Sequence, residues 1–156
     1  MTNETVQVAI IMGSDSDLPV VEASFSILDD FGVKYTKNVM SAHRTPHDVM
    51  ELIKNSEENG CKVFIAAAGM AAHLAGAVAA HSTKPVIGIP IESGGMGGID
   101  SLLSTAMMPP GVPVATVAIG KSGAKNSAIL AVQILATSDE DLAQKLVEYK
   151  QNMRSE

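Results

Sequence analysis

The fold is decided by VQVAIIM at residues 6–12, which is followed directly by GSDSD at residues 13–17. The first segment is apolar except for one glutamine, and four of its seven residues are β-branched. Such a run is typical of a strand that is buried on both faces, as the strands of parallel sheets are. The small polar residues that follow predict a turn, and an apolar stripe over residues 16–31 predicts a helix that ends at Gly32.

The same strand-then-helix pattern recurs to the end of the chain. Further strands are predicted at 34–40, 63–68, 85–90 and 114–119, and further helices at 46–58, 71–81, 101–106, 122–137 and 139–153. Asp100 and Ser138 are the predicted caps of the last short helix and of the C-terminal helix. Repeated units of this kind predict a parallel sheet with helices on both faces and right-handed crossovers. We therefore expect one α/β domain over residues 1–156, a three-layer, doubly wound parallel sheet of flavodoxin-like strand order 2-1-3-4-5, plus a C-terminal helix.

Composition excludes several classes of protein. Of the 156 residues, 46% are hydrophobic and 18% charged, which is not the composition of a disordered chain. The net charge of −6 argues against a nucleic-acid partner or a polybasic membrane anchor. The apolar stretch 63–83 is interrupted by glycines and histidines, and residues 1–4 lack the features of a secretory leader. With Cys61 as the sole cysteine, a cytoplasmic location is expected. Because the core is rich in small residues, we also expect an oligomer.

Three polar loops are predicted to meet at one edge of the sheet. Ligands of open parallel sheets bind beyond the carboxyl ends of the strands, where the strand order reverses, here between the first and third strands. The loops at that edge read GSDSD at 13–17, SAHRTP at 41–46 and GMAAH at 69–73. They bring glycines, hydroxyls, carboxylates, two histidines and an arginine together, so a ligand site is expected there.

The first of these loops has the features of a phosphate site. It opens a helix, whose free N–H groups favour an anion, and Gly13 permits close approach of the backbone. Ser14 and Ser16 supply hydroxyls, and Arg44 of the neighbouring loop supplies a guanidinium suited to phosphate. Alternatively, the loop serves only to cap the helix. Asp17 is a candidate acceptor for ribose hydroxyls, and magnesium is a weaker interpretation because a third ligand is lacking.

Two histidines are candidates for chemistry. His43 follows a strand end beside Arg44 and suits general acid–base catalysis, the alternative being a surface histidine in a turn. His43 and His47 have zinc-like spacing, but Pro46 starts the helix between them, so they do not share a helical face. His73 is either a core histidine bonded to a carbonyl or a polar point in the pocket wall.

The motifs at these loops resemble those of a known family. SAHRTP at 41–46, GSDSD at 13–17 and AGMAAHLAG at 68–76 look like the class I N5-carboxyaminoimidazole ribonucleotide mutases of purine biosynthesis, the PurE family. Further runs extend the resemblance over nearly the whole chain, namely DSLLS at 100–104, MP at 108–109, GVPV at 111–114, AIGK at 118–121 and AVQILA at 131–136.

The resemblance implies a flavodoxin-like isomerase that works without cofactor or metal. It implies movement of a carboxylate from the exocyclic nitrogen of the substrate to ring carbon 4, giving 4-carboxy-5-aminoimidazole ribonucleotide. It also implies a homo-octamer with sites at subunit contacts. A transient contact with the ATP-dependent synthase that makes the carbamate is a further expectation. Carried over by motif, His43 is the proton carrier, and the implied substrate-binding residues are Gly13, Ser14, Ser16, Asp17, Ser41, Ala42, Arg44, Gly69, Ala71, His73 and Leu74.

A sister class carboxylates aminoimidazole ribonucleotide directly with CO₂. That class has lysine after the loop histidine and an Arg-Ser-Asn type of sequence after the third strand, whereas this chain has Arg44 and AAH at 71–73. The sequence departs from the mutases at Met70, Ala75 and Met107, where glycine, proline and glutamine are usual. The carboxylase and a flavodoxin-like nucleotide-binding module without catalysis stay as alternatives.

Overall fold

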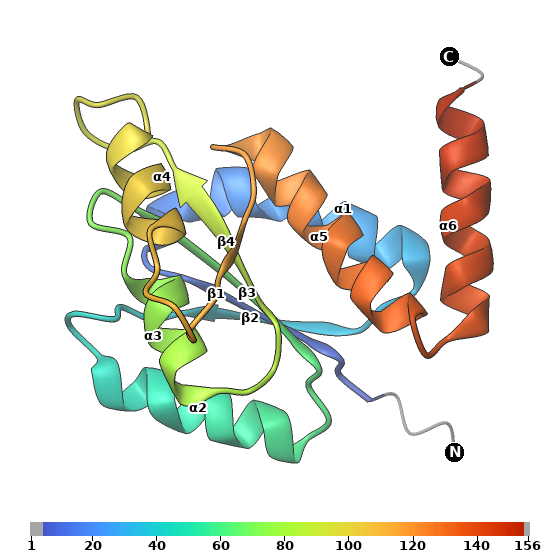
Figure 1. Ribbon diagram of the computed structural model, residues 1–156, viewed down its shortest axis with the longest axis horizontal. Coiled ribbons are helices and arrows are strands. Elements are labelled where there is room, and N and C mark those ends of the chain that lie inside the picture. The colour runs from blue at the N-terminus through green and yellow to red at the C-terminus, as the bar shows by residue number, and fades with distance from the viewer. Residues whose placement is uncertain (1–4, 155–156) are drawn as a thin grey trace.

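Five parallel strands form one sheet in the order β2-β1-β3-β4-β5, the predicted order (Figure 1). The computed structural model describes residues 5–154; residues 1–4, on which the expectation about a leader rests, lie outside them. The strands are β1 (Val8–Met12), β2 (Tyr35–Val39), β3 (Val63–Gly69), β4 (Val86–Ile91) and β5 (Ala115–Thr116). The helices are the 3₁₀ turn η1 (Asp15–Asp17), α1 (Leu18–Phe31), α2 (Pro46–Glu58), α3 (Leu74–His81), α4 (Ile99–Ala106), α5 (Lys121–Ala136) and α6 (Glu140–Met153).

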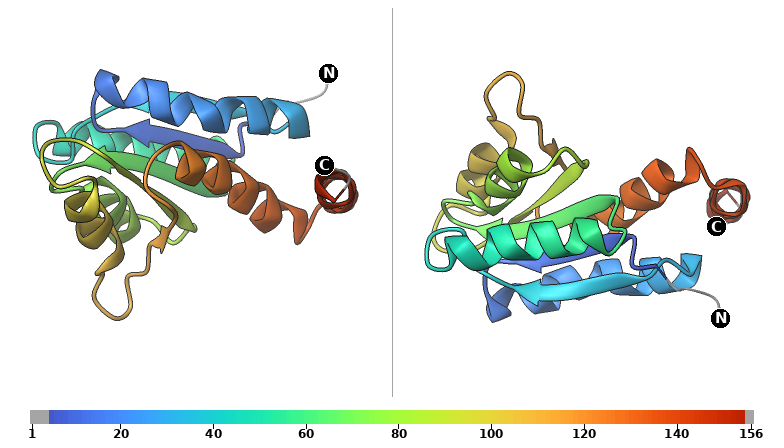
Figure 2. Two further views of the ribbon diagram at one scale, coloured as in Figure 1. Left: turned by 90° about the horizontal axis from the view of Figure 1, so that it is seen from above. Right: turned by 90° about the horizontal axis from the view of Figure 1, so that it is seen from below.

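Helices cover both faces of the sheet, with α1 and α5 on one side and α2, α3 and α4 on the other (Figures 1 and 2). Successive residues of β1 point to opposite faces. Val8, Ile10 and Met12 accordingly belong to the core beneath α1 and α5, while Ala9 and Ile11 belong to the core beneath α2 and α3. Burial on both faces is the reason why β1 shows no alternation of polar and apolar residues.

The C-terminal helix α6 lies outside the three layers, beside the end of α5 (Figure 1). It is attached through Leu142, which is buried, and through Tyr149, whose ring lies 5.7 Å from that of Phe31. No helix within residues 5–154 combines the length and the apolar character needed to cross a membrane.

The last strand is shorter than expected, since β5 covers only Ala115–Thr116 instead of residues 114–119. Pro90 of β4 accounts for the early end. Its carbonyl accepts a hydrogen bond from the Gly120 N–H (3.0 Å), so the residue faces the β5 side. Its ring nitrogen has no hydrogen to donate, and the ladder therefore stops.

Several predicted helix starts differ from the structure, including that of α1, which begins at Leu18 rather than at residue 16. Helix α3 begins at Leu74 rather than at residue 71, which leaves residues 71–73 in the loop. Helix α4 is preceded by Gly98 in the left-handed conformation (φ 85°), and Asp100 lies inside its first turn instead of capping it. Helix α6 is capped by Asp139, which accepts a hydrogen bond from the Leu142 N–H (3.1 Å), and not by Ser138. Asp139 has the extended backbone that lets its carboxylate reach the free N–H.

Close packing at the start of α5 requires glycine. A Cβ atom on Gly123 would overlap the backbone carbonyl of Ala118, whereas a Cβ on Gly95 would meet nothing within 4 Å. We predict that Gly123→Ala lowers the free energy of unfolding by about 3 kcal/mol, since it forces the backbone apart. Urea unfolding of this variant, with Gly95→Ala as the matched control, measures the effect. Equal stability of the two variants would contradict the prediction.

Candidate active site

The loops that follow β1, β2 and β3 line one cavity of about 490 Å³ at the carboxyl edge of the sheet. Every residue predicted to bind substrate or to move a proton lines it, namely Gly13, Ser14, Ser16, Asp17, Ser41, Ala42, His43, Arg44, Gly69, Ala71, His73 and Leu74. Ala68, Met70 and Ser93 also line the cavity and were not among the predicted site residues. Ser93 follows β4, the next strand whose carboxyl end reaches this edge, so its position was the available signal.

The first loop is a capping box. Asp17 Oδ2 accepts a hydrogen bond from the Ser14 N–H (3.2 Å), and Ser14 Oγ accepts from the Ser16 N–H (3.3 Å) and from the Ser16 hydroxyl (2.9 Å). Ser14 therefore caps the 3₁₀ turn η1, whereas Asp17 at the start of α1 makes no side-chain capping bond to that helix. Because Ser14 Oγ is the acceptor in both of its bonds, its own proton is left for an anion in the cavity.

Asp17 is 5% exposed, and burial raises the pKa of its carboxyl although the backbone N–H groups of Ser14 and Gly13 act in the opposite direction. Burial disfavours the ionised form because it removes water from the charge. One carboxylate oxygen accepts from Ser14, and the residue lines the cavity. The carboxylate can therefore also accept hydrogen bonds from ligand hydroxyls.

The second loop presents His43 and Arg44 on a turn that is held by hydrogen bonds among its own residues. Thr45 Oγ1 accepts from the Ser41 N–H (3.0 Å) and donates to the Ser41 carbonyl (3.1 Å). Ser41 Oγ accepts from the Arg44 N–H (3.1 Å), and Pro46 starts α2. The serine, threonine and proline of SAHRTP thus form the scaffold, and the exposed histidine and arginine are left for a ligand.

The third loop contains Met70, which is the only non-glycine residue with a positive φ (54°) within residues 5–154. Glycine is favoured in this conformation, because a side chain is crowded there. Gly69 permits a close approach, since a Cβ on it would lie 2.8 Å from Ser93 Cβ. The loop ends at His73, whose N–H donates to the Ala71 carbonyl (2.9 Å) and whose carbonyl receives the Ala77 N–H of α3 (2.9 Å).

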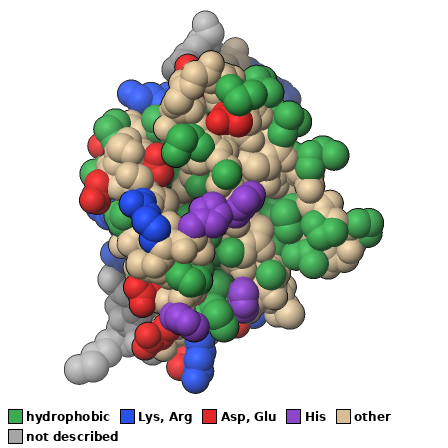
Figure 3. Space-filling model, turned by 90° about the vertical axis from the view of Figure 1, so that its left-hand side faces the viewer, with side chains coloured by type: hydrophobic (Ala, Val, Ile, Leu, Met, Phe, Trp, Pro, Cys, Tyr) green, Lys and Arg blue, Asp and Glu red, His purple; other side chains and the backbone are tan. Residues whose placement is uncertain are grey.

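The two loop histidines are in contact, although they are 30 positions apart in the sequence. His43 Nε2 lies 2.7 Å from His73 Nδ1, and the rings meet edge to face at 79°. His73 is exposed in the cavity wall, so the interpretation of it as a core histidine was wrong. Figure 3 shows histidine side chains adjoining one another on this face, with a basic side chain close by. Since one nitrogen must donate and the other accept, the contact holds a single proton between two imidazoles.

Comparison with known proteins agrees with this geometry. Residues 7–156 match the family described as AIR carboxylase. The chain belongs to this family. It is 53% identical over 147 residues to the N5-carboxyaminoimidazole ribonucleotide mutase of Bacillus subtilis, covering 94% of this chain and 91% of that protein. It is 51% identical to the enzyme of the same name from Pyrococcus abyssi, covering 95% and 84%. The crystal structure of Treponema denticola PurE superposes with a TM-score of 0.87 at 31% identity, covering 96% of this chain and 92% of that one.

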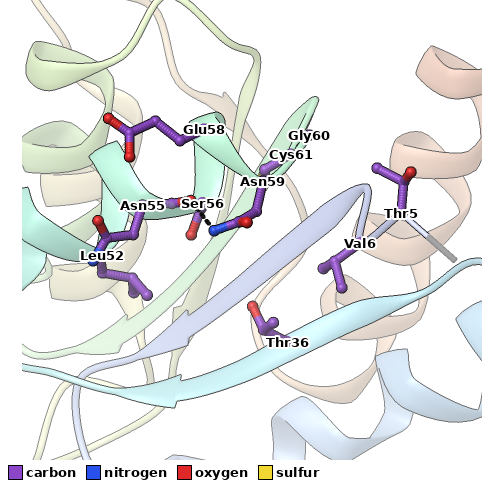
Figure 4. A pocket seen from close by; sticks show the side chains of 10 residues that line it. All are labelled: Thr5, Val6, Thr36, Leu52, Asn55, Ser56, Glu58, Asn59, Gly60 and Cys61. Carbon is purple, nitrogen blue, oxygen red and sulfur yellow. Dashed lines mark hydrogen bonds between the residues drawn. The ribbon is translucent and has the colours of Figure 1, made fainter. Parts of the chain in front are cut away.

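This member of the AIR carboxylase family has a second, larger cavity of about 710 Å³ at the amino ends of the strands (Figure 4). Its side chains are mainly amides and hydroxyls, and Asn59 Nδ2 donates to the Asn55 carbonyl (2.7 Å). Cys61 at its edge is buried, and burial raises the pKa of the thiol, which keeps the sulfur protonated and unreactive. The groups that suit catalysis lie at the other end of the sheet.

The described residues of this chain give little support to metal binding. Residues 5–154 contain no group of three or more His, Cys, Asp or Glu side chains placed to hold an ion. The zinc-like spacing of His43 and His47 does not produce such a group, and His43 instead contacts His73.

The buried Asp17 predicts a pH-dependent effect on stability. Asp17→Asn keeps an acceptor for the Ser14 N–H but removes the buried charge. Because burial raises the carboxyl pKa above its ordinary value of 3.8, ionisation of Asp17 weakens the fold as the pH rises through that raised value. The difference in unfolding free energy between the two proteins, variant minus native, should therefore be larger at about pH 7 than at about pH 4. Denaturant titrations at both pH values measure it, and a difference independent of pH would contradict the expectation.

Proposed function

We propose that this chain is an isomerase of purine biosynthesis. It converts N5-carboxyaminoimidazole ribonucleotide into 4-carboxy-5-aminoimidazole ribonucleotide without a cofactor. The family membership and the relatives named as mutases support the reaction class. The observation that carries the proposal is the 2.7 Å contact between His43 and His73 in a cavity that also holds Arg44 and serine hydroxyls. A phosphate anchor and a proton carrier in one small site are what this reaction requires.

The ribonucleotide is proposed to bind through its phosphate and sugar at the first two loops. The Arg44 guanidinium and the hydroxyls of Ser14 and Ser16 would hold the 5′-phosphate, and Asp17 would accept from the ribose. Gly13, Ser41 and Ala42 complete this half of the cavity. The heterocycle would then lie against Gly69, Ala71 and Leu74, whose small or apolar surfaces admit a flat ring.

The carboxylate transfer needs one group that first gives and then takes a proton. His43 protonates the exocyclic nitrogen, the carbon–nitrogen bond breaks, and CO₂ is held beside the ring. Carbon 4 then forms the new carbon–carbon bond with CO₂, and His43 removes the hydrogen from that carbon. The proton balance closes, because the imidazole ends as it began. His73, in contact with His43, fixes which nitrogen carries the proton.

A histidine suits both steps at neutral pH. An ordinary carboxylic acid is ionised there and cannot give a proton, and an ordinary lysine is charged and cannot take one. Retaining CO₂ within the cavity keeps the two fragments together, which can supply an effective concentration of about 10⁵ M or more.

Self-association is part of the proposal. The imidazoles of His43 and His73 are both exposed in the single chain, whereas the chemistry needs water to be excluded. Large apolar side chains are also exposed on and after α4, including Ile99, Leu103 and Met107, and the segment between α4 and β5 projects from the body (Figure 2). We propose that neighbouring copies cover these surfaces in a homo-octamer of single-domain catalytic subunits. A cytoplasmic location and a transient contact with the carbamate-forming synthase belong to the same proposal.

An assay without ATP separates the proposed activity from its alternatives. The mutase converts the carbamate and gains little from bicarbonate, whereas the CO₂-dependent carboxylase converts aminoimidazole ribonucleotide only when bicarbonate is added. A nucleotide-binding module binds the ribonucleotide and turns over neither. Either of the last two results would overturn the proposed reaction.

The role of His43 predicts a loss of turnover without a loss of binding. His43→Asn keeps a polar side chain on a turn fastened by Ser41 and Thr45, so the fold is retained. Without a proton carrier, kcat should fall by about 10²- to 10⁴-fold. Steady-state kinetics, together with calorimetric binding of aminoimidazole ribonucleotide, measure both properties. Near-normal turnover would refute the assignment.

Arg44 predicts the complementary result. Arg44→Ala removes a charged hydrogen-bond donor to the phosphate and leaves the histidine pair in place, so KM should rise by about 10- to 100-fold. The effect should disappear for the nucleoside that lacks the phosphate. His47→Ala, on the adjacent α2, is the matched surface control, and an unchanged KM in Arg44→Ala contradicts the phosphate role.

A further inference from the structure

The third loop of the site lacks the internal side-chain hydrogen bonds that hold the first two loops. In the first loop, Asp17 and Ser14 bond across three positions, and in the second, Thr45 and Ser41 bond across four. The residues from Met70 to Ala72 have no side-chain hydrogen-bonding group. The loop therefore needs support from another part of the chain.

That support comes from Ser104, on α4. Ser104 Oγ accepts a hydrogen bond from the Ala72 N–H (2.9 Å), and its hydroxyl lies 3.2 Å from the Met70 carbonyl and 2.7 Å from the Asp100 carbonyl. One oxygen atom thus contacts the backbone on both sides of Ala71. Ser104 is 32 positions from Ala72 and does not line the cavity.

The contact falls where the backbone conformation is least favourable. Met70 has a φ of 54°, a conformation that a side chain disfavours, so other interactions must hold the loop in this shape. Ser104 accepts from the Ala72 N–H, and its single proton, which lies nearest to the Asp100 carbonyl, is also within reach of the Met70 carbonyl, so the residue opposes relaxation of the loop beside Met70.

Helix α4 is itself anchored, so the support is rigid. Ser101, one turn before Ser104, is fully buried, and its hydroxyl lies 2.8 Å from the Ile91 carbonyl and 2.9 Å from the Gly98 carbonyl. These bonds attach the helix to the end of β4. Through Ser101 and Ser104, helix α4 therefore links the end of β4 to the loop that ends at His73.

We propose that Ser104 is a positioning residue that sets the contact between His73 and His43. The His73 ring follows directly after the segment that Ser104 holds, and the 2.7 Å separation of the two nitrogens tolerates only a small displacement before the hydrogen bond weakens. The effect on turnover rests on the proposed function, whereas the effect on the imidazole pair does not.

The first test reads the histidines directly in the whole protein. Ser104→Ala removes the hydroxyl, and imidazole nitrogen NMR should then show altered His43 and His73 resonances and unaltered His47 and His81 resonances. Ser127→Ala is the matched control, because Ser127 makes a similar bond within a helix, to the Ala124 carbonyl (2.7 Å), on α5. Unaltered resonances of His43 and His73 in Ser104→Ala overturn the proposal.

The second test separates positioning from binding and from folding. In Ser104→Ala, kcat should fall about tenfold with a changed pH profile, while KM stays within about twofold, since the phosphate half of the cavity is untouched. Ser104→Thr and Ser104→Val have the same shape and differ in the hydroxyl, so Thr should retain kcat and Val should lose it. Equal kcat in these two variants overturns the proposal even if Ser104→Ala folds poorly. Suppose that Ser104→Ala alters the His43 and His73 resonances but the native protein shows no turnover. The proposed function then fails, and the positioning role of Ser104 stands.

Discussion

The site depends on the parallel pairing of β1 with β2 and β3, in a register that brings the carboxyl ends of the three strands together. Met12, the last residue of β1, is paired with Val39 of β2 and with Ala67 of β3. Three chain segments therefore leave the sheet side by side and in the same direction. Burial of β1 on both faces holds this arrangement, because its five residues are enclosed between the two hydrophobic cores of the domain.

The three loops are held in different ways, and this difference bears on what each can do. The first two are fastened by bonds between their own side chains and backbone, so their geometry follows from a few adjacent residues. These are the loops to which anchoring of the phosphate and sugar is assigned. The third loop is small and apolar, which suits it to contact a heterocycle, but it has no internal fastening. Its backbone is instead bonded to Ser104 of α4, and our proposal is that this bond also sets the distance between the two imidazoles.

The same small residues that shape the site leave the single chain incompletely covered. Alanine and glycine permit the close contacts at Gly69 and Gly123 but give little bulk with which to enclose a ligand. The exposed imidazoles, and the large apolar side chains beside α4, are the surfaces that remain. Association of several copies satisfies both features at once, since an apolar surface gains free energy when it is buried. The proposed assembly and the proposed chemistry therefore support each other.

The sequence by itself determined the sheet order and the location of the cavity, which follow from local hydrophobic periodicity and from the rule that places ligands beyond strand ends. Most residues that line the cavity were also predicted, several of them only through the resemblance to a known family, but Ala68, Met70 and Ser93 were not. The sequence did not indicate that Ser41 and Thr45 hold the second loop together, because those bonds depend on the backbone conformation of the turn. It misplaced Asp100 and Ser138 as caps, since capping depends on the backbone conformation of one residue, and it extended β5 beyond the point where Pro90 stops the ladder. Only the tertiary structure decided that His43 meets His73 and that Ser104 bonds to Ala72 in the loop that ends at His73. Those pairs are 30 or more positions apart, and no local pattern specifies a distance between residues that meet only after the chain has folded.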